Sequence, residues 1–383
     1  MDFELTSDQK LMVESCRRMV SRQIQPILDR EPQDKPLSKK AAQEIMGHCV
    51  NLGLTAARVP EQLGGSGMRL LDYGLLCEQL PPAALFIVFP QETTATRIAF
   101  GSTAGQKERF LPDIIGGRRI TCTAATEPGV GSDPRGIKTA AREDGDHIVI
   151  TGRKMWISNA TISDIVNVTC RMERKGTSEL VRILVEKDKS EFEAVEIPVT
   201  GMQQSHLGEM VFQDCRVERG NLLAGDDGVA KILTLTWLAN RPIIGLCAVH
   251  MAERAFQMAK IFAKERVQFG KSIGGFQLVQ ERLADIETAI VTSRLLCYHA
   301  LAAMDRGERA NGASAMAKRY AVSACDRAIG LAMQLHGSMG LSRELGLERL
   351  ARDVRMLSIP DGTPEILALI QGREITGQDA FRA

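Results

Sequence analysis

The chain has 383 residues, 44% of them hydrophobic, and its 48 basic side chains are balanced by 47 acidic ones, for a net charge of +1. This balance argues against nucleic acid or an acidic membrane surface as the main partner, because both attract proteins with a clear basic excess. The first residues form no cationic, apolar leader, and the apolar runs are far shorter than a membrane span of about 20 residues. We therefore expect a cytoplasmic protein of two or three domains.

Aromatic residues are scarce, with 12 Phe, 3 Tyr and 2 Trp. A large core must then be built from aliphatic side chains and the 16 methionines, which suits helix packing better than a β-sandwich. The nine cysteines contain no C-x-x-C pair, and the six histidines have no metal-ligand spacing. The sequence therefore indicates no metal site.

The first and middle parts of the chain have different textures. Residues 1–120 are predicted to be helical, beginning with the capping-box spacing of Thr6-Ser7-Asp8-Gln9. Residues 121–228 contain short β-branched segments separated by Gly and Asp turns, which predict a small antiparallel β-barrel. The expected strands are Ile120–Thr126, His147–Thr151, Ile165–Cys170, Leu180–Glu186, Phe192–Ile197 and Glu209–Phe212.

The last part of the chain, residues 229–383, is predicted to be helical again. Long segments rich in Ala and Leu are joined by short loops, which is typical of a four-helix bundle. The expected helices are Arg241–Val267, Phe276–Arg306, Ala313–His336 and Leu345–Ile359. The expected fold is therefore mainly α with a central β-domain.

Two segments of the middle part carry groups suited to a flat or anionic ligand. Thr126-Glu127-Pro128-Gly129-Val130-Gly131-Ser132-Asp133 enters a turn whose small residues let backbone N–H groups and hydroxyls approach a ligand. Taken alone, such a segment is more often only a turn. Lys154-Met155-Trp156-Ile157-Ser158-Asn159 places an indole near a hydroxyl, which predicts either core packing or a stacking wall.

Two further segments close long helices in the last part of the chain. They are Arg266-Val267-Gln268-Phe269-Gly270 and Gln334-Leu335-His336-Gly337-Ser338-Met339-Gly340. Each alone fits an ordinary helix C-terminus, where glycine and cations are favoured. The chain contains neither G-x-G-x-x-G nor a P-loop, so a Rossmann or P-loop nucleotide site is unsupported.

In their order and spacing, these four segments resemble the acyl-CoA dehydrogenase family of flavoproteins, and the likeness extends from Phe3 to about Gly377. The resemblance implies an N-terminal helical domain, a β-barrel domain and a C-terminal helical bundle. It also implies FAD as cofactor, an acyl-CoA substrate, an electron-transfer flavoprotein as electron acceptor and a homo-oligomer, usually a tetramer.

The resemblance assigns roles to individual residues of the four segments. Ala125 and Thr126 match the strand and turn that face the flavin and the thioester, and Ser132 matches the serine beside the pantetheine chain of the substrate. Trp156 matches the tryptophan that packs on the flavin, and Ser158 matches the hydroxyl residue near flavin N5. The positions that hold the pyrophosphate and adenine of FAD in a neighbouring subunit match Arg266, Phe269, Gln334 and Gly337. Arg241 matches a substrate-side arginine, although a salt-bridged cation at a helix start explains it nearly as well.

Members of this family remove the α-proton of a thioester while the β-hydrogen leaves as hydride to flavin N5, so a carboxylate must face the α-carbon. One family position for this base is Asn240 here, which cannot serve. The other lies in Ile359-Pro360-Asp361-Gly362-Thr363-Pro364-Glu365 and makes Asp361 the expected base. Gly362 matches a family position that contacts the substrate, and Thr363 matches one that contacts the cofactor. The local alternative is that Asp361 only decorates a helix N-terminus.

Most relatives have glutamate where this chain has Asp361. Aspartate is shorter by about 1.5 Å, which favours a substrate whose α-carbon lies closer to the loop, such as a bulky or cyclic acyl group. Some family members that oxidise cyclohexanecarboxyl-CoA-type thioesters resemble this chain in having aspartate there, so the resemblance implies an alicyclic substrate of the cyclohexane- or cyclohexene-carboxyl-CoA type, or a branched one. Whether Glu92 or Glu365 assists as a second acid is open. Three other activities stay open as well: an enoyl-CoA reductase working in the reverse direction, a lyase such as a desulfinase without net redox, and a non-catalytic flavoprotein.

Overall fold

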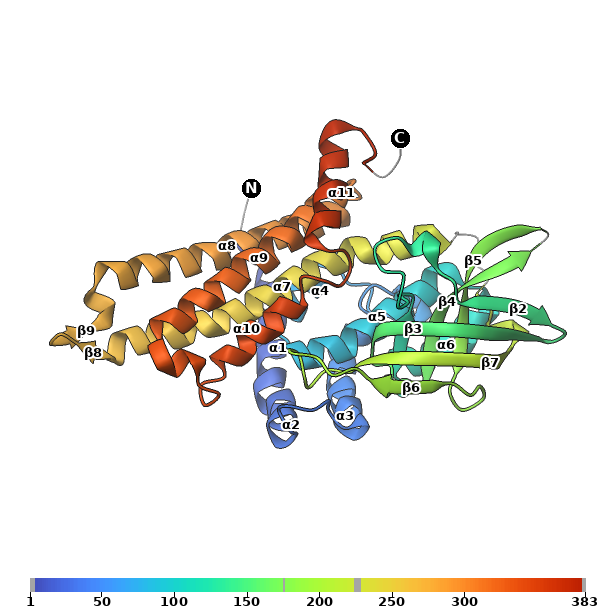
Figure 1. The fold of residues 1–383 in the computed structure, drawn as a ribbon, viewed down its shortest axis with the longest axis horizontal. Coiled ribbons are helices and arrows are strands. Elements are labelled where there is room, and N and C mark those ends of the chain that lie inside the picture. Colours follow the sequence, from blue (N-terminus) through green and yellow to red (C-terminus); the bar gives the residue numbers. More distant parts are fainter. Residues whose placement is uncertain (1–3, 175, 224–228, 381–383) are drawn as a thin grey trace.

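The computed structural model describes residues 4–174, 176–223 and 229–380, except for the side chains of 229–231 and 233. Three layers follow one another along the chain (Figure 1). An N-terminal group of helices comes first, a curved sheet follows, and a long helical bundle completes the chain.

The N-terminal layer begins with the predicted capping box. The hydroxyl of Thr6 accepts from the Gln9 N–H at 3.2 Å, and the Gln9 side chain accepts from the Thr6 N–H at 3.1 Å. Of the helices in this layer, α5 is the most deeply embedded, because nearly all of its residues are buried. The helices are α1 (Ser7–Met19), α2 (Gln25–Arg30), α3 (Lys39–Val50), α4 (Leu70–Cys77), α5 (Pro82–Gly101) and α6 (Ala104–Ile115), with a π-helical segment at Val20–Ile24.

The middle layer is a half-barrel sheet with the strand order β1-β4-β2-β3-β7-β6, and β5 pairs with the other side of β4. The expected antiparallel pairing holds for most neighbours, but β4 runs parallel to both β1 and β2. The pattern did not predict β2, an Ala-Ala-Arg-Glu-Asp strand of low β-propensity that is held by its pairing with β3. The strands are β1 (Thr121–Ala124), β2 (Ala140–Asp144), β3 (His147–Ser158), β4 (Ile165–Arg174), β5 (Thr177–Glu186), β6 (Glu193–Glu196) and β7 (Leu207–Glu218).

The C-terminal layer is a bundle of α7, α8, α9 and α10, from which α11 projects (Figure 1). Small residues let its helices approach closely: a Cβ added to Gly245 on α7 would lie 2.6 Å from the Cys297 sulfur on α8. This packing explains how so long a chain needs few aromatic residues. The helices are α7 (Val229–Glu265), α8 (Gln277–Asp305), α9 (Asn311–Leu335), α10 (Leu347–Met356) and α11 (Pro364–Thr376), with a hairpin of β8 (Val267–Gln268) and β9 (Lys271–Ser272). No helix in the described ranges is long and apolar enough to cross a membrane.

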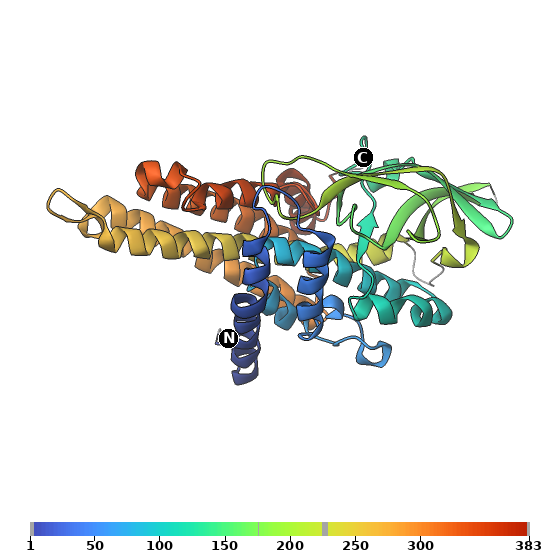
Figure 2. The same cartoon turned by 90° about the horizontal axis from the view of Figure 1, so that it is seen from below.

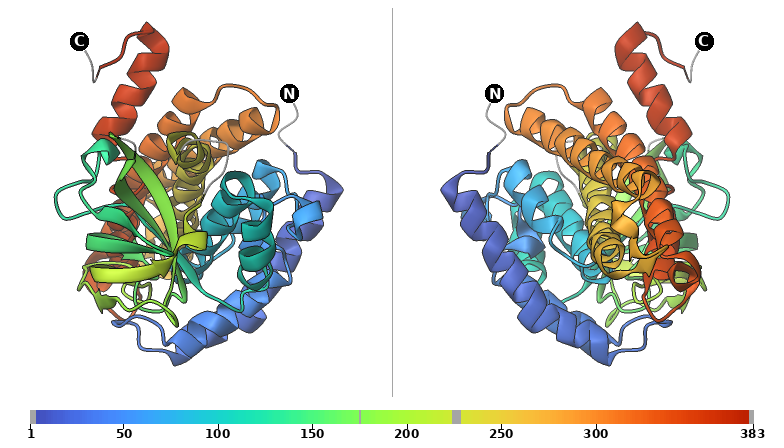
Figure 3. Two further views of the ribbon diagram at one scale, coloured as in Figure 1. Left: turned by 90° about the vertical axis from the view of Figure 1, so that its right-hand side faces the viewer. Right: turned by 90° about the vertical axis from the view of Figure 1, so that its left-hand side faces the viewer.

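The junction between the sheet and the bundle is formed by α5 and α7. α5 contacts α7, β1 and β3, and the Asn159 amide at the end of β3 donates to the Ile87 carbonyl of α5 at 2.9 Å. In Figure 2, which views the molecule from below, the N-terminal helices cross in front of the bundle and the sheet lies at one end of the molecule. The sheet faces the viewer in the left panel of Figure 3. Chemistry placed at this junction therefore draws on all three layers.

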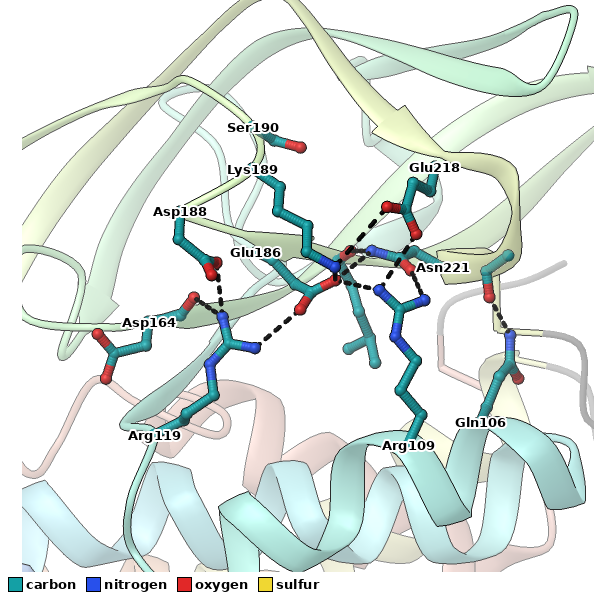
Figure 4. A network of polar contacts seen from close by, with 12 residues as sticks. Gln106, Arg109, Arg119, Asp164, Glu186, Asp188, Lys189, Ser190, Glu218 and Asn221 are labelled. Carbon is teal, nitrogen blue, oxygen red and sulfur yellow. Dashed lines mark hydrogen bonds and ion pairs between the residues drawn. The ribbon is translucent and has the colours of Figure 1, made fainter.

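A polar network fastens the sheet to the N-terminal helices (Figure 4). The buried carboxylate of Glu186 on β5 pairs with Arg109 of α6 and, at 2.8 Å, with Arg119. Burial alone would raise the pKa of Glu186, but hydrogen bonds from Arg119 and Asn221 hold it below its usual value. Each of these groups has a partner within the network, so we assign the network a structural role.

Candidate active site

The loop that contains Asp361 leads directly into α11. Asp361 has φ +52°, and Gly362 follows with φ +107°. Positive φ is unfavourable for a residue with a Cβ and persists only where the surroundings enforce it. The Thr363 hydroxyl accepts from the Ile366 N–H at 3.4 Å as the N-cap of α11, and Pro364 occupies the first helical turn. The cap and the proline are as the sequence predicts.

Two buried cations bind the backbone of this loop. The Lys318 ammonium, on α9 and only 1% exposed, donates to the carbonyl of Gly362 at 2.6 Å and to that of Pro360. The Arg241 guanidinium of α7 donates from Nε to the carbonyl of Asp361 at 3.1 Å. The carbonyls of three successive residues, 360 to 362, are thus bound by these two cations. Asp361 itself is half-buried.

The environment of Lys318 perturbs its titration. Burial lowers the pKa of Lys318 to about 8, against an opposing effect of the Asp361 carboxylate, and the nearby Arg241 lowers it further. Burial also lowers the pKa of Arg241, again opposed by Asp361. The sequence analysis did not single out Lys318. The available signal for its burial was that it is the one lysine of an alanine-rich helical segment, Ala313–His336.

The residues expected beside the flavin gather at one end of the sheet. The Met155 N–H donates to the Thr126 carbonyl at 2.9 Å, which sets the segment after β1 against β3. Trp156 on β3 has φ +62° and is 49% exposed, so its indole is not core filler. Ala125, Thr126 and Ser158 are half-buried nearby in the same two segments, and Ser132 lies exposed in the following turn.

A buried ion pair between Lys154 and Glu127 supports this end of the sheet. The Lys154 ammonium donates to the Ala125 carbonyl and to the Glu127 carboxylate, both at 2.9 Å. Glu127 also accepts the N–H groups of Lys138 and Thr139 at 2.8 Å each. Burial would raise the pKa of Glu127, but these bonds hold it below its ordinary value.

The remaining predicted residues lie at the opposite end of the bundle (Figure 1). Arg266 follows α7, and Phe269 in the β8–β9 turn is 93% exposed with φ +50°. Gln334 ends α9 near Gly337, and stacking of Phe262 on His336 at 4.5 Å joins this end of α9 to that of α7. About 36 Å of helix separates Arg241 from the end of α7. One chain therefore does not bring these four residues to the sheet-side site.

The other acids near the loop have partners or face solvent. The Glu92 carboxylate binds the Arg58 guanidinium, with 2.8 Å between Arg58 Nε and Glu92 Oε1, and accepts the Thr96 hydroxyl at 2.8 Å. Asn240 accepts from Arg58 at 3.3 Å. Glu365 is exposed in the first turn of α11. Of the acids considered, Asp361 alone combines the enforced loop conformation with bound cations.

Comparison with known proteins agrees with this layout. Three family models match successive parts of the chain: the acyl-CoA dehydrogenase N-terminal domain over residues 6–118, the middle domain over 122–215 and the C-terminal domain over 226–376. Together they cover most of the sequence.

Individual relatives and structures are similar over nearly their full lengths. Cyclohex-1-ene-1-carbonyl-CoA dehydrogenase of Geobacter metallireducens is 31% identical over 97% of this chain and 98% of its own. The caffeyl-CoA reductase-Etf complex subunit CarC of Acetobacterium woodii is 29% identical over 86% and 88%. The crystal structure of a glutaryl-CoA dehydrogenase from Mycobacterium smegmatis with FADH2 has a TM-score of 0.89 at 25% identity, over 99% and 97%. The chain belongs to the acyl-CoA dehydrogenase family, FAD-dependent oxidoreductases that act on the CH–CH bond of acyl-CoA thioesters.

Proposed function

We propose that Asp361 is the base that removes the α-proton of an acyl-CoA while the β-hydrogen leaves from the neighbouring carbon, so that a Cα–Cβ double bond forms. The observation that carries this proposal is the enforced backbone of Asp361, at φ +52° with its carbonyl bound by Arg241 and the flanking carbonyls bound by Lys318. Such a loop holds a carboxylate in one direction, as proton abstraction from a weak carbon acid requires. The Asp361 N–H is the protein donor that we assign to the developing enolate oxygen.

The residues at the end of the sheet suit an isoalloxazine ring. The half-exposed Trp156 offers a flat apolar face, and Thr126 and Ser158 offer hydroxyls beside it. When bound, FAD accepts the β-hydrogen of the substrate as hydride. We assign Ala125, Thr126, Trp156, Ser158 and Thr363 to this part of the cofactor.

A second copy of the chain completes the cofactor site in this proposal. In Figure 1 the β8–β9 hairpin that contains Phe269 and the strand β3 that contains Trp156 lie at opposite ends of the molecule. Phe269 is almost fully exposed. Strained backbone of the kind seen at Phe269 clusters at active sites and ligand clamps. We therefore propose that Arg266, Phe269, Gln334 and Gly337 hold the FAD of a neighbouring subunit in a homotetramer.

The substrate follows in part from the length of the base. Asp361 reaches less far than a glutamate, so the α-carbon must approach the loop more closely. The related G. metallireducens enzyme is named for a cyclohexene-carbonyl thioester, which supports an alicyclic or branched acyl group here. We place the substrate beside Gly362, Arg241 and Ser132.

The electron partner in this proposal is an electron-transfer flavoprotein. The related CarC protein is named as a subunit of a caffeyl-CoA reductase-Etf complex, which supports both this partner and the reverse, enoyl-reducing direction. Mixing oxidised holoenzyme with acyl-CoA, and photoreduced holoenzyme with the enoyl-CoA, measures the two directions separately.

The test is bleaching of the flavin by a panel of straight, branched and alicyclic acyl-CoAs in a rapid-mixing experiment. We expect Asp361→Asn to retain FAD and substrate binding and to lose flavin reduction by about 10²–10⁴-fold or more. Glu365→Gln, which changes the exposed acid in the first turn of α11, is the matched control and keeps the wild-type rate. Near-normal reduction by Asp361→Asn, or no bleaching by any thioester, would overturn the proposal.

A further inference from the structure

The segment between β6 and β7 leaves the sheet and binds α10. The Thr200 carbonyl accepts from the Arg352 guanidinium at 2.5 Å, and the Met202 N–H donates to the Asp353 carboxylate. Between these two bonds, a Cβ added to Gly201 would lie 2.2 Å from the Arg352 carbonyl oxygen, so the backbone of the segment is in direct contact with the helix. This β6–β7 segment therefore fastens the sheet to α10.

The bond between Met202 and Asp353 holds two groups in unfavourable states. Met202 has φ +54° although it has a Cβ, and such a conformation persists only where the surroundings enforce it. Asp353 is 4% exposed, and burial raises the pKa of its carboxyl, against the opposing effects of the Met202 N–H and of nearby arginines. A strained backbone and a buried charge are each costly, so the fold maintains this contact at the expense of stability elsewhere.

Gln204, in the same segment, extends the contact to the N-terminal helices. It is 2% exposed, and its side-chain oxygen accepts from Arg349 of α10 at 2.8 Å. Its side-chain nitrogen donates to the Leu28 carbonyl of α2 at 3.0 Å, and its own carbonyl accepts from the Leu37 N–H at 3.1 Å. α10 is therefore held against both other layers at one place.

This contact connects the two sides of the proposed reaction centre. On the sheet side, Leu207 follows Met202 by five residues and pairs with Ser158 of β3. On the bundle side, Asp361 follows Asp353 by eight residues, over which the end of α10 continues into successive hydrogen-bonded turns. A shift of α10 relative to the β6–β7 segment therefore moves the Asp361 loop relative to the end of β3.

We propose that Asp353 is a positioning residue of the proposed reaction. Through its bond to Met202, it places the Asp361 loop so that the α-carbon of a substrate faces this base while the β-carbon faces the flavin side of β3. The inference rests on the proposed function and adds the residue that aligns its two sides. Lys318 and Arg241 hold the loop from within the bundle, whereas the Asp353 contact sets where the loop lies relative to the sheet.

The test changes the carboxylate on the FAD-loaded enzyme. Asp353→Ala removes the acceptor of the Met202 N–H, and Asp353→Asn keeps an oxygen in its place. At saturating acyl-CoA we expect Asp353→Ala to reduce its flavin about 10- to 100-fold more slowly than the wild type, because a carboxylate displaced by roughly 1 Å loses rate on that order. Asp353→Asn is expected to recover most of this loss, with FAD content unchanged in both variants.

Isotope effects separate positioning from a general loss of stability. The substrate is deuterated either at the α-carbon or at the β-carbon. A misplaced base slows removal of the α-proton more than departure of the β-hydrogen, so we expect the ratio of the α- to the β-deuterium effect to rise in Asp353→Ala. The matched control is Glu186→Ala, which removes a buried carboxylate from the network in Figure 4. It is expected to lower the unfolding temperature and to leave the ratio unchanged.

A second variant approaches the same contact from the sheet. Gly201→Ala forces the β6–β7 segment away from the Arg352 carbonyl and leaves Asp353 intact, so it decides the question if Asp353→Ala does not fold. We expect it to raise the same isotope ratio. An unchanged ratio in the folded variants, a rate of Asp353→Ala equal to that of Glu186→Ala, or no recovery in Asp353→Asn would overturn the inference.

Failure of the proposed function has a different signature, which the wild type reveals. In that case no acyl-CoA bleaches the wild-type flavin, or Asp361→Asn bleaches normally. If instead the wild type bleaches with an α-deuterium effect and Asp361→Asn does not bleach, the proposed function stands and the Asp353 variants alone decide the positioning role.

Discussion

The Lys318 ammonium lies 2.6 Å from the carbonyl oxygen of Gly362, the residue that follows Asp361. The same ammonium binds the carbonyl of Pro360, so one cation holds the residues on both sides of the proposed base. Because a cation–carbonyl hydrogen bond is stronger than one between neutral groups, this contact fixes the direction of the loop. We regard Lys318 as a positioning residue, since it holds the backbone rather than the reacting atoms.

Lys318→Met is the direct test of that role. We expect flavin reduction to slow by about 10²-fold, because loosening the loop misplaces the carboxylate by roughly 1 Å, while FAD content is retained. Arg319→Ala, at the exposed neighbouring position of α9, is the control and leaves the rate unchanged. A rapid-mixing measurement that finds Lys318→Met as fast as the control would remove Lys318 from the mechanism.

The pH profile carries a second prediction. Burial lowers the pKa of Lys318 to about 8, so the ammonium that holds the loop is lost as pH rises through that value. We expect the flavin reduction rate to fall above about pH 8, and Lys318→Arg, which stays charged, to remove this limb. A wild-type rate that does not change between pH 7 and 9.5 would contradict the prediction.

The stability contribution of Lys318 has the opposite sign. Its pKa in the folded chain lies below the ordinary value of 10.5, so between about pH 8 and 10.5 the unfolded chain binds the proton and the folded chain does not. The free energy of unfolding contributed by this group therefore rises with pH across that window. Denaturant titrations of wild type and Lys318→Met across this range measure the difference.

The Asp361 loop shows what the sequence could and could not predict. The acid, the glycine, the threonine cap and the first-turn proline are adjacent in the chain, and their local chemistry is sufficient to predict a bend before a helix. Lys318 and Arg241 reach the same loop from α9 and α7, more than forty residues away in the chain. Nothing local distinguishes such a lysine from a surface one.

The same limit applies to the sheet and to the charges on α5. β2 has weak intrinsic β-propensity and is defined by its partner β3, so its pattern gave no strand. Glu92 was a candidate acid because its type and position permitted the role. Only the folded arrangement shows it bound to Arg58.

Glu92→Gln tests whether Glu92 is structural. The amide leaves the Arg58 guanidinium without its counter-charge inside the protein, so we expect a loss of about 3–5 kcal/mol in the free energy of unfolding. The folded holoenzyme should still reduce its flavin. The double variant Arg58→Met/Glu92→Gln should lose less stability than Glu92→Gln alone, as chemical denaturation will show. A stable Glu92→Gln protein with no flavin reduction would instead make Glu92 an acid–base group.

Lys154→Met tests how the sheet supports the flavin side of the site. Without the ammonium, the Ala125 carbonyl and the Glu127 carboxylate lose their shared partner. The segment that includes Thr126 is then fixed less firmly against β3, to which the Met155 N–H still binds it. A hydrogen bond to a charged group contributes about 1.5–3 kcal/mol, so we expect FAD to bind the apoprotein roughly tenfold more weakly or worse. Fluorescence titration of apoprotein with FAD measures this loss, and Lys138→Met, with its exposed side chain, is the matched control. If Lys154→Met lowered the unfolding temperature but left FAD affinity unchanged, the ion pair would support the sheet alone and not the cofactor.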